Sequence, residues 1–281
     1  MSKFYGYDEA MENDIAKITT PKLALMSDVV ASDKKFIRME NGALTVIAGV
    51  LIAVGNSVFK TEKTTLTASN LDGTASKFEV GKDYCIYICD PTGMVYIGPF
   101  WGDIYLSSDN GASGLQSKKG AVPITGTEGL NWYIANERAM RVGKRLPTYA
   151  EFCKGAYGSP QGADGNNTYS WSATSNTART TCGNVKNAVS ATNVRDLVGN
   201  VWKWLDEFIH DPTGSAWNWY DVMSGQKVGQ LYMANNTGLH ALVGGGRWDN
   251  GVRAGSRTVN CISCPWYVDT SVGVWCVCDS L

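Results

Sequence analysis

The sequence predicts an α+β protein whose first part is rich in β-strands and whose second part mixes helices with strands. Short β-type runs separated by turn signals fill the chain up to about residue 114. Two helical patterns follow between residues 132 and 156, and strand-like segments return after residue 196. At 281 residues with 44% hydrophobic content, the chain is long enough for one large domain or two ordinary ones.

The N-terminal part contains short turn motifs that are typical of β-hairpins. Its turn signals are Asn41-Gly42, Gly55-Asn56, Asp72-Gly73 and Pro91-Thr92-Gly93. The apolar run 43–54 is too short to span a bilayer as a helix and contains β-branched residues, so it predicts a buried strand. Residues 84–89 alternate aromatic and β-branched types with cysteine and predict a central strand.

A polar segment rich in Gly and Ser, residues 107–120, predicts the domain boundary, which we place between 115 and 116. Beyond it, apolar residues at helical spacing predict a helix from residue 132 to 142, with Gly143 as its stop. These residues are Trp132, Ala135, Ala139 and Val142. Thr148 and Glu151 form a capping-box pattern that predicts a second helix over 149–156.

Residues 196–204 predict a strand that places Trp202 and Trp204 on one face, where paired aromatic side chains usually pack inward. The two histidines, His210 and His240, are interpreted as loop or surface residues.

The formal net charge of −1 provides no basic field for a nucleic-acid partner, and no segment predicts membrane insertion. The first residues carry acids and no apolar core, so we expect no secretory signal and reduced thiols. Cys261 and Cys264 have zinc-like spacing. Cys276 and Cys278, separated by one residue, make an unusual second half for a zinc site, so we expect no bound metal.

Four motifs in the second half resemble the C-type-lectin-like fold of the formylglycine-generating enzyme superfamily over about residues 132–277. They are Gly-Lys-Arg-Leu-Pro-Thr-Tyr-Ala-Glu-Phe at 143–152, Gly-Asn-Val-Trp-Lys-Trp at 199–204, Gly-Gly-Arg-Trp at 245–248 and Gly-Val-Trp at 273–275. Within that superfamily, residues 244–281 resemble the variable region of proteins that retroelements diversify at adenines, with Asn codons as favoured starting points.

That resemblance implies a non-enzymatic receptor-binding protein, placed on a virion tail or a bacterial cell surface. It implies that residues 1–115 mount or oligomerise the molecule, while 116–281 bind a cell-surface protein or glycan. It also implies a homotrimer, with no cofactor and no catalytic residue. If the stretch is not diversified, the alternative is an ordinary surface loop of a lectin-like domain. If the protein binds no specific ligand, the alternative is a purely structural fibre protein.

Nine residues of types reachable from an Asn codon are the expected ligand-binding set: Asp249, Val252, Arg253, Ile262, Ser263, Cys264, Tyr267, Asp269 and Ser271. The residues expected to hold the backbone include Gly245, Gly246, Trp248, Gly251, Gly255 and Gly273. Trp266 is expected to pack in the core.

An enzyme is the principal alternative, because the same superfamily includes copper- and iron-dependent oxygenases. Its formylglycine-generating branch uses a cysteine pair near the C-terminus, and Cys261 and Cys264 lie in a comparable place. The residues that surround the pair in that branch have no match here. The iron-dependent branch needs several histidine ligands, and this chain has two histidines.

Overall fold

The structure, a computed structural model, describes residues 93–111, 114–162, 177–185, 187–211, 216–224 and 226–279, together with short segments between residues 18 and 76. Contacts divide the chain into two compact units. Unit 1 comprises Met1–Trp101 with Asp279–Leu281, and unit 2 comprises Gly102–Cys278.

Unit 1 is built from short antiparallel strands. Its strands are β1 (Ile18–Thr19), β2 (Ile37–Glu40), β3 (Ala43–Val46), β4 (Leu51–Val54), β5 (Ser57–Thr61), β6 (Thr64–Leu66), β7 (Ala68–Ser69), β8 (Ala75–Ser76) and β9 (Met94–Tyr96). Two three-stranded sheets have the orders β2-β3-β6 and β1-β5-β4. Glu40 pairs with Ala43 and Val54 with Ser57, so two of the predicted turn signals lie between paired strands.

The apolar run 43–54 is not the single buried strand that the sequence predicts. It is divided into β3 and β4, which belong to different sheets. The division falls at a turn where Gly49 has a φ of 83°, a left-handed value that glycine adopts readily. The predicted strand 84–89 lies outside the described residues.

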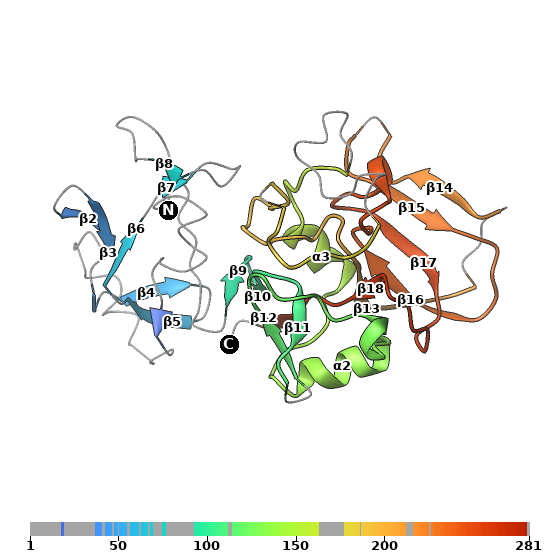
Figure 1. Cartoon of the computed structure of the whole chain (residues 1–281), viewed down its shortest axis with the longest axis horizontal. Coiled ribbons are helices and arrows are strands. Elements are labelled where there is room, and N and C mark those ends of the chain that lie inside the picture. The colour runs from blue at the N-terminus through green and yellow to red at the C-terminus, as the bar shows by residue number, and fades with distance from the viewer. Residues whose placement is uncertain are drawn as a thin grey trace. The chain divides into compact units, whose positions relative to one another are not determined.

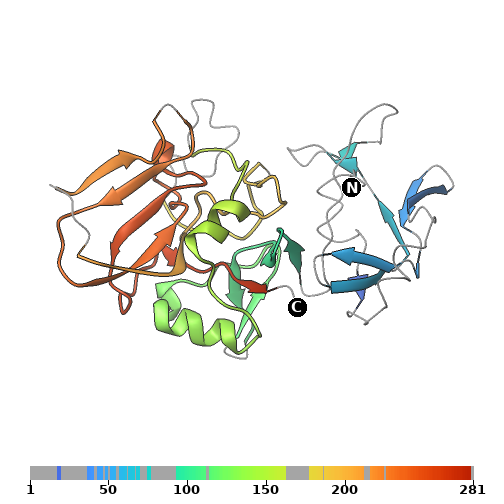
Figure 2. The ribbon, with the colours of Figure 1, turned by 180° about the vertical axis from the view of Figure 1, so that it is seen from behind.

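Unit 2 contains the helices and the largest sheet (Figures 1 and 2). The elements after β9 are β10 (Phe100–Asp103), β11 (Ser107–Asp109), β12 (Leu115–Ser117), η2 (Gly126–Glu128), α2 (Trp132–Met140), α3 (Tyr149–Gly155), β13 (Trp202–His210), β14 (Asn218–Asp221), β15 (Gln230–Met233), β16 (Leu239–Gly244), η3 (Gly251–Arg253), β17 (Val259–Ser263), β18 (Val272–Gly273) and β19 (Val277–Asp279). The large sheet has the order β14-β15-β17-β16-β13-β18.

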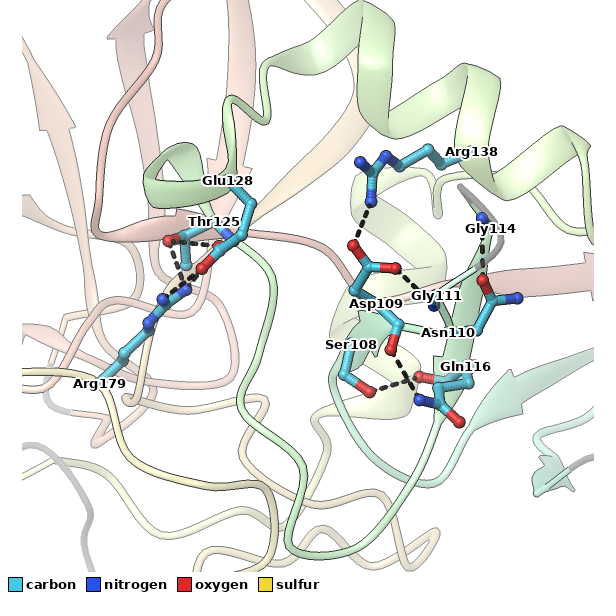
Figure 3. Close-up of polar contacts among 10 residues, drawn as sticks. All are labelled: Ser108, Asp109, Asn110, Gly111, Gly114, Gln116, Thr125, Glu128, Arg138 and Arg179. Carbon is cyan, nitrogen blue, oxygen red and sulfur yellow. Dashed lines mark hydrogen bonds and ion pairs between the residues drawn. The ribbon is translucent and has the colours of Figure 1, made fainter.

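The division by contacts falls earlier in the chain than the predicted boundary between 115 and 116. Strands β11 and β12 pair antiparallel as a hairpin, and both belong to unit 2. Figure 3 shows how the hairpin is held: Arg138 of α2 forms an ion pair with Asp109 at 3.2 Å, and the other Asp109 oxygen accepts from Gly111 N. The polar composition of this segment therefore reflects a turn held by side-chain hydrogen bonds.

Both predicted helices are present. In α2, the Asn131 side chain caps the N-terminus by accepting from Ile134 N, and Ala135 and Ala139 are fully buried. In α3, the capping box between Thr148 and Glu151 forms as the sequence predicts. Among the described residues, no helix combines the length and the apolar character that crossing a membrane requires.

The two helices lie on opposite faces of the large sheet. Trp202 and Trp204, on one face of β13, share a core cluster with Ala135 and Ala139 of α2. On the other face, Phe152 of α3 lies against Gly244 and Gly245, where an added Cβ would meet its ring at about 3 Å. The paired tryptophans therefore pack inward as expected.

The strand of Trp202 and Trp204 begins later than predicted, because residues 196–201 turn. Asp196, Gly199 and Asn200 have φ values of 62°, 84° and 58°. This turn is fixed by Lys203, whose fully buried Nζ donates to Leu197 O at 2.9 Å and to Gly199 O at 2.7 Å.

Asp196 is also fully buried and accepts from Gly183 N at 2.7 Å. Burial raises the pKa of Asp196 to about 6, opposed by the Gly183 hydrogen bond and the Lys203 charge. Burial likewise lowers the pKa of Lys203, and the attraction of Asp196 opposes that shift. Each charge therefore depends on the other for compensation inside the domain.

His240 differs from its interpretation as a loop or surface residue. It lies in β16, opposite Ile209, and is fully buried. Neither of its ring nitrogens has a hydrogen-bond partner in the described structure. His210 lies at the end of β13, exposed, with its Nδ1 3.0 Å from Asp211.

Replacing Lys203 with methionine is expected to lower the free energy of unfolding by about 3–5 kcal/mol, because Asp196 is left buried without its compensating charge. Urea unfolding at neutral pH measures the change. Lys118→Met, at an exposed position, is the matched control and is expected to change stability by about 0.5 kcal/mol or less. Equal unfolding midpoints for the two variants would contradict the buried-pair interpretation.

Candidate ligand-binding surface

The C-terminal stretch, residues 244–278, is attached to the rest of unit 2 by its main chain. Several amide and carbonyl groups along it bond to distant backbone, and these contacts do not depend on side-chain identity. They are Gly199 N to Gly245 O (3.1 Å), Trp248 N to Asn200 O (3.1 Å), Arg257 N to Val228 O (2.8 Å), Trp132 N to Pro265 O (3.0 Å) and Gly126 N to Asp269 O (2.9 Å).

Glycine is sterically required at several positions of this stretch. A Cβ at Gly245 would lie 2.1 Å from Leu197 O, and one at Gly255 would lie 2.3 Å from the Val228 carbonyl. Gly245 and Gly246 also have φ values of 87° and 81°. The backbone-holding residues expected from the sequence thus include ones that no larger side chain can replace without displacement.

The nine expected ligand-binding residues fall into three groups by exposure. Val252, Arg253 and Tyr267 are exposed. Partly buried residues are Asp249, Ile262, Cys264 and Asp269. Ser263 and Ser271 are buried, with Ser271 only 3% exposed.

Arg247 joins three of these residues from opposite ends of the stretch. Its Nε lies 2.7 Å from Asp249 Oδ1, and a terminal nitrogen donates to Ser271 Oγ at 3.2 Å. Ser271 in turn donates to Asp269 Oδ1 through its backbone N–H at 2.6 Å and its hydroxyl at 2.5 Å. These hydrogen bonds hold the two ends of the loop together, while Asp249 and Asp269 remain partly exposed.

The loop between β17 and β18 presents three consecutive apolar side chains, Trp266, Tyr267 and Val268, which we call the 266–268 tip. Trp266 is 60% exposed, so its predicted core packing is wrong. The reason is backbone geometry: Pro265 O and Asp269 O, on either side of the tip, both accept hydrogen bonds from unit 2, and the residues between them project outward. The Asp269 carboxylate raises the pKa of Tyr267, and burial adds to that shift.

Asp269, the residue after the tip, bonds to η2, whose capping box is shown in Figure 3. Thr125 N donates to Glu128 Oε2 at 2.8 Å, and Arg179 bonds both Glu128 oxygens at 2.6 and 2.9 Å. Gly126, inside this turn, has no room for a Cβ, because an added Cβ would lie 2.4 Å from Asp269 N. Sequence reasoning missed Arg179, which no local pattern connects with Glu128.

A second feature that sequence reasoning missed is the aromatic row: Trp202, Trp219, Tyr232 and Trp217. Trp202 and Trp219 are stacked with ring centroids 6.3 Å apart, Trp219 and Tyr232 are 4.6 Å apart, and Tyr232 and Trp217 are 6.0 Å apart. The row runs from the core to Trp217, which is 61% exposed. The alternation Trp217-Asn218-Trp219 was the available signal, because it is typical of a strand with one aromatic face.

Two comparisons of the sequence with known proteins give matches. Residues 34–96 match a family model described as the Mtd second domain. The tail fiber receptor-binding protein of Bordetella phage BPP-1 is 28% identical over 219 residues, which cover 68% of this chain and 53% of that protein. The match therefore spans about half the length of that relative.

Two solved structures resemble the whole chain. The Major Tropism Determinant M1 variant gives a TM-score of 0.54 at 21% identity, covering 94% of this chain and 86% of that one. The I1 variant gives 0.51 at 20% identity, covering 99% of both. The chain therefore shares the fold of the tropism determinants. This fold, mostly β with few helices, confirms the α+β class and the C-type-lectin-like resemblance.

The cysteines of this chain do not favour the oxidase alternative. Cys261 is buried, and desolvation raises the pKa of its thiol to about 11, so it is protonated at neutral pH. All six described cysteines are free thiols. Within the described ranges, His, Cys, Asp and Glu form no group of three or more placed to hold a metal ion.

Replacing Glu128 with glutamine is expected to remove part of the acid sensitivity of the domain. The Arg179 hydrogen bond holds the pKa of Glu128 below its ordinary value of 4.5. The pair therefore stabilises the fold above that value, and this contribution is lost as the pH falls through the lowered pKa.

Urea midpoints measured from pH 7 down to about pH 3 test this expectation. The difference between wild type and Glu128→Gln is expected at neutral pH and is expected to vanish in acid. Glu137→Gln, which alters an exposed pair with Arg141, is the control. A Glu128 difference that persists unchanged at the lowest pH would contradict the assignment.

Proposed function

We propose that this protein is a receptor-binding protein of a phage tail, which displays variable residues on a C-type-lectin-like scaffold to bind a ligand on the target cell. The observation that carries the proposal is the 266–268 tip, three exposed apolar side chains on a loop fixed at both ends by main-chain hydrogen bonds. The match to a protein named tail fiber receptor-binding protein supports it.

The exposed residues have the composition of an interaction site. Trp, Tyr and Arg supply most of the binding energy in protein interfaces, and Trp266, Tyr267 and Arg253 are exposed here. Exposed apolar side chains that are contiguous, as in the tip, mark interaction sites more often than scattered ones do. The rigid backbone beneath them lowers the entropy lost on binding.

Ligand contact is assigned to the exposed and partly buried members of the expected set: Asp249, Val252, Arg253, Ile262, Cys264, Tyr267 and Asp269. Substitution at exposed positions usually changes stability by about 0.5 kcal/mol or less, so these positions can vary without loss of the fold. Ser263 and Ser271, being buried, are assigned to support of the surface.

The remaining parts of the proposal concern assembly. Unit 1, which makes up most of the predicted 1–115 part, mounts or oligomerises the molecule, and unit 2 binds a cell-surface protein or glycan. The protein acts without catalysis on the virion tail. A homotrimer would present three copies of the surface. Linked sites of this kind raise avidity by about 10² to 10⁴ over a single site.

The retroelement part of the proposal predicts a DNA feature. Downstream of the gene we expect a near-copy of the codons for residues 244–281, differing at adenines, together with a reverse transcriptase gene. Sequencing of the flanking DNA checks this. A flanking region without such a copy would leave an undiversified binding protein.

Tyr267→Ala is expected to weaken adsorption to target cells by about tenfold or more, because tyrosines at interface centres are often worth about 1.4 kcal/mol or more. Binding of the labelled full-length protein to cells measures the effect. Tyr133→Ala, at an exposed tyrosine of α2, is the matched control. If both variants adsorb like wild type while their thermal unfolding is unchanged, the tip is not the contact surface.

A further inference from the structure

Arg253 lies over the ring of Trp219, with its guanidinium carbon 5.1 Å from the ring centroid. Trp219 is itself stacked with the buried Trp202, with ring planes only 15° apart. Within the described ranges, Arg253 is exposed and forms no ion pair with any carboxylate. A cation is thus supported by an aromatic stack that continues into the core.

The segment that carries Arg253 is joined rigidly to the β14–β15 hairpin. Arg253 O accepts from Thr258 Oγ1 at 2.5 Å, and the same hydroxyl oxygen accepts from Gln230 N at 3.2 Å. Gly229 and Gly255 approach so closely that a Cβ at Gly229 would lie 2.9 Å from the Gly255 backbone. Arg253 and the aromatic row are therefore held in one arrangement before any ligand binds.

We propose that Arg253, Trp217, Trp219 and Tyr232 form a docking surface for a protein partner that presents a carboxylate beside apolar side chains. This proposal rests on the proposed receptor-binding function and names the chemistry of the partner. A guanidinium supported by an aromatic ring keeps its planar N–H donors for a bidentate bond to a carboxylate. The neighbouring Trp217 ring supplies apolar area for the flanking side chains.

Two observations favour a protein over a glycan. Val252, next to Arg253, is 54% exposed, and an aliphatic side chain gains from contact with another apolar group but offers nothing to sugar hydroxyls. The carboxylate of Asp221, on the same face of β14 as Trp219, already accepts from Gln230 Nε2 at 2.8 Å. The surface thus offers a cation and apolar area, with its nearby carboxylate already bonded.

The β14–β15 part of this surface lies outside the stretch 244–281. Trp217, Trp219 and Tyr232 would therefore be constant in every variant, while Arg253 lies at a position expected to vary. The docking surface combines a fixed aromatic platform with a replaceable charged group. Arg253 would then make this variant specific for a carboxylate, whereas every variant would keep the apolar contact with the aromatic side chains.

The test uses the full-length protein and bacterial cells that adsorb the wild type. Arg253→Gln and Trp217→Ala are compared with Lys154→Gln and Tyr157→Ala, which change an exposed cation and an exposed aromatic ring at α3 or just after it. Arg253→Lys keeps the charge but loses the planar fork. Thermal unfolding and near-ultraviolet circular dichroism confirm that each variant is folded. Parallel samples of cells are treated with protease, with periodate, or with a carbodiimide and an amine that convert carboxylates to amides.

We expect adsorption to cells to fall by about tenfold or more for Arg253→Gln and Trp217→Ala, to fall less for Arg253→Lys, and to stay unchanged for the controls. Protease and amidation of the cells abolish adsorption, and periodate leaves it intact. Unchanged adsorption of Arg253→Gln and Trp217→Ala would overturn the docking surface alone. Loss of adsorption with periodate but not with protease identifies a glycan and overturns the protein partner. Wild type that adsorbs to no cells removes the proposed function as well.

Discussion

The structure depends on main-chain hydrogen bonds that hold the C-terminal stretch without using its side chains. Gly245, Trp248, Pro265 and Asp269 all bond through backbone atoms to residues of other elements. Close packing reinforces these bonds, because Gly126, Gly245 and Gly255 leave no space for a Cβ. A segment anchored in this way keeps its path when its outward side chains change, which is what a surface for recognition of varied targets requires.

The same constraint explains how two segments far apart in sequence build one surface. The hydroxyl of Thr258 bonds both Arg253 O and Gln230 N, so the η3 segment and the start of β15 move as one body. In the aromatic row each ring packs against the next, from Trp202 in the core to Trp217 at the surface. The surface side chains are therefore held in place before binding because the row to which they belong is anchored by the buried Trp202.

The predictable parts of this fold were those specified by neighbours in sequence. The Thr148–Glu151 capping box and the Ala135–Ala139 spacing are local patterns, and both helices form where they indicate. Trp266, His240 and Arg179 were misjudged or missed because their environments depend on residues far along the chain. Trp266 is exposed since its loop is tied down at both ends, and His240 is buried since β16 lies between two strands. No pattern within a few residues of either position reports such contacts.

The two buried serines affect what diversity the surface can present. Ser271 is enclosed and bonded to both Arg247 and Asp269, and Ser263 lies in β17 opposite Ala241. A variant with a bulky or charged residue at either position would lose packing or leave polar groups unpaired, and many such variants would fail to fold. Selection for a foldable chain therefore acts before selection for a target. Under the proposed function, fewer variants would fold than the codons allow, and the failures would be concentrated at Ser263 and Ser271, which are assigned to support of the surface.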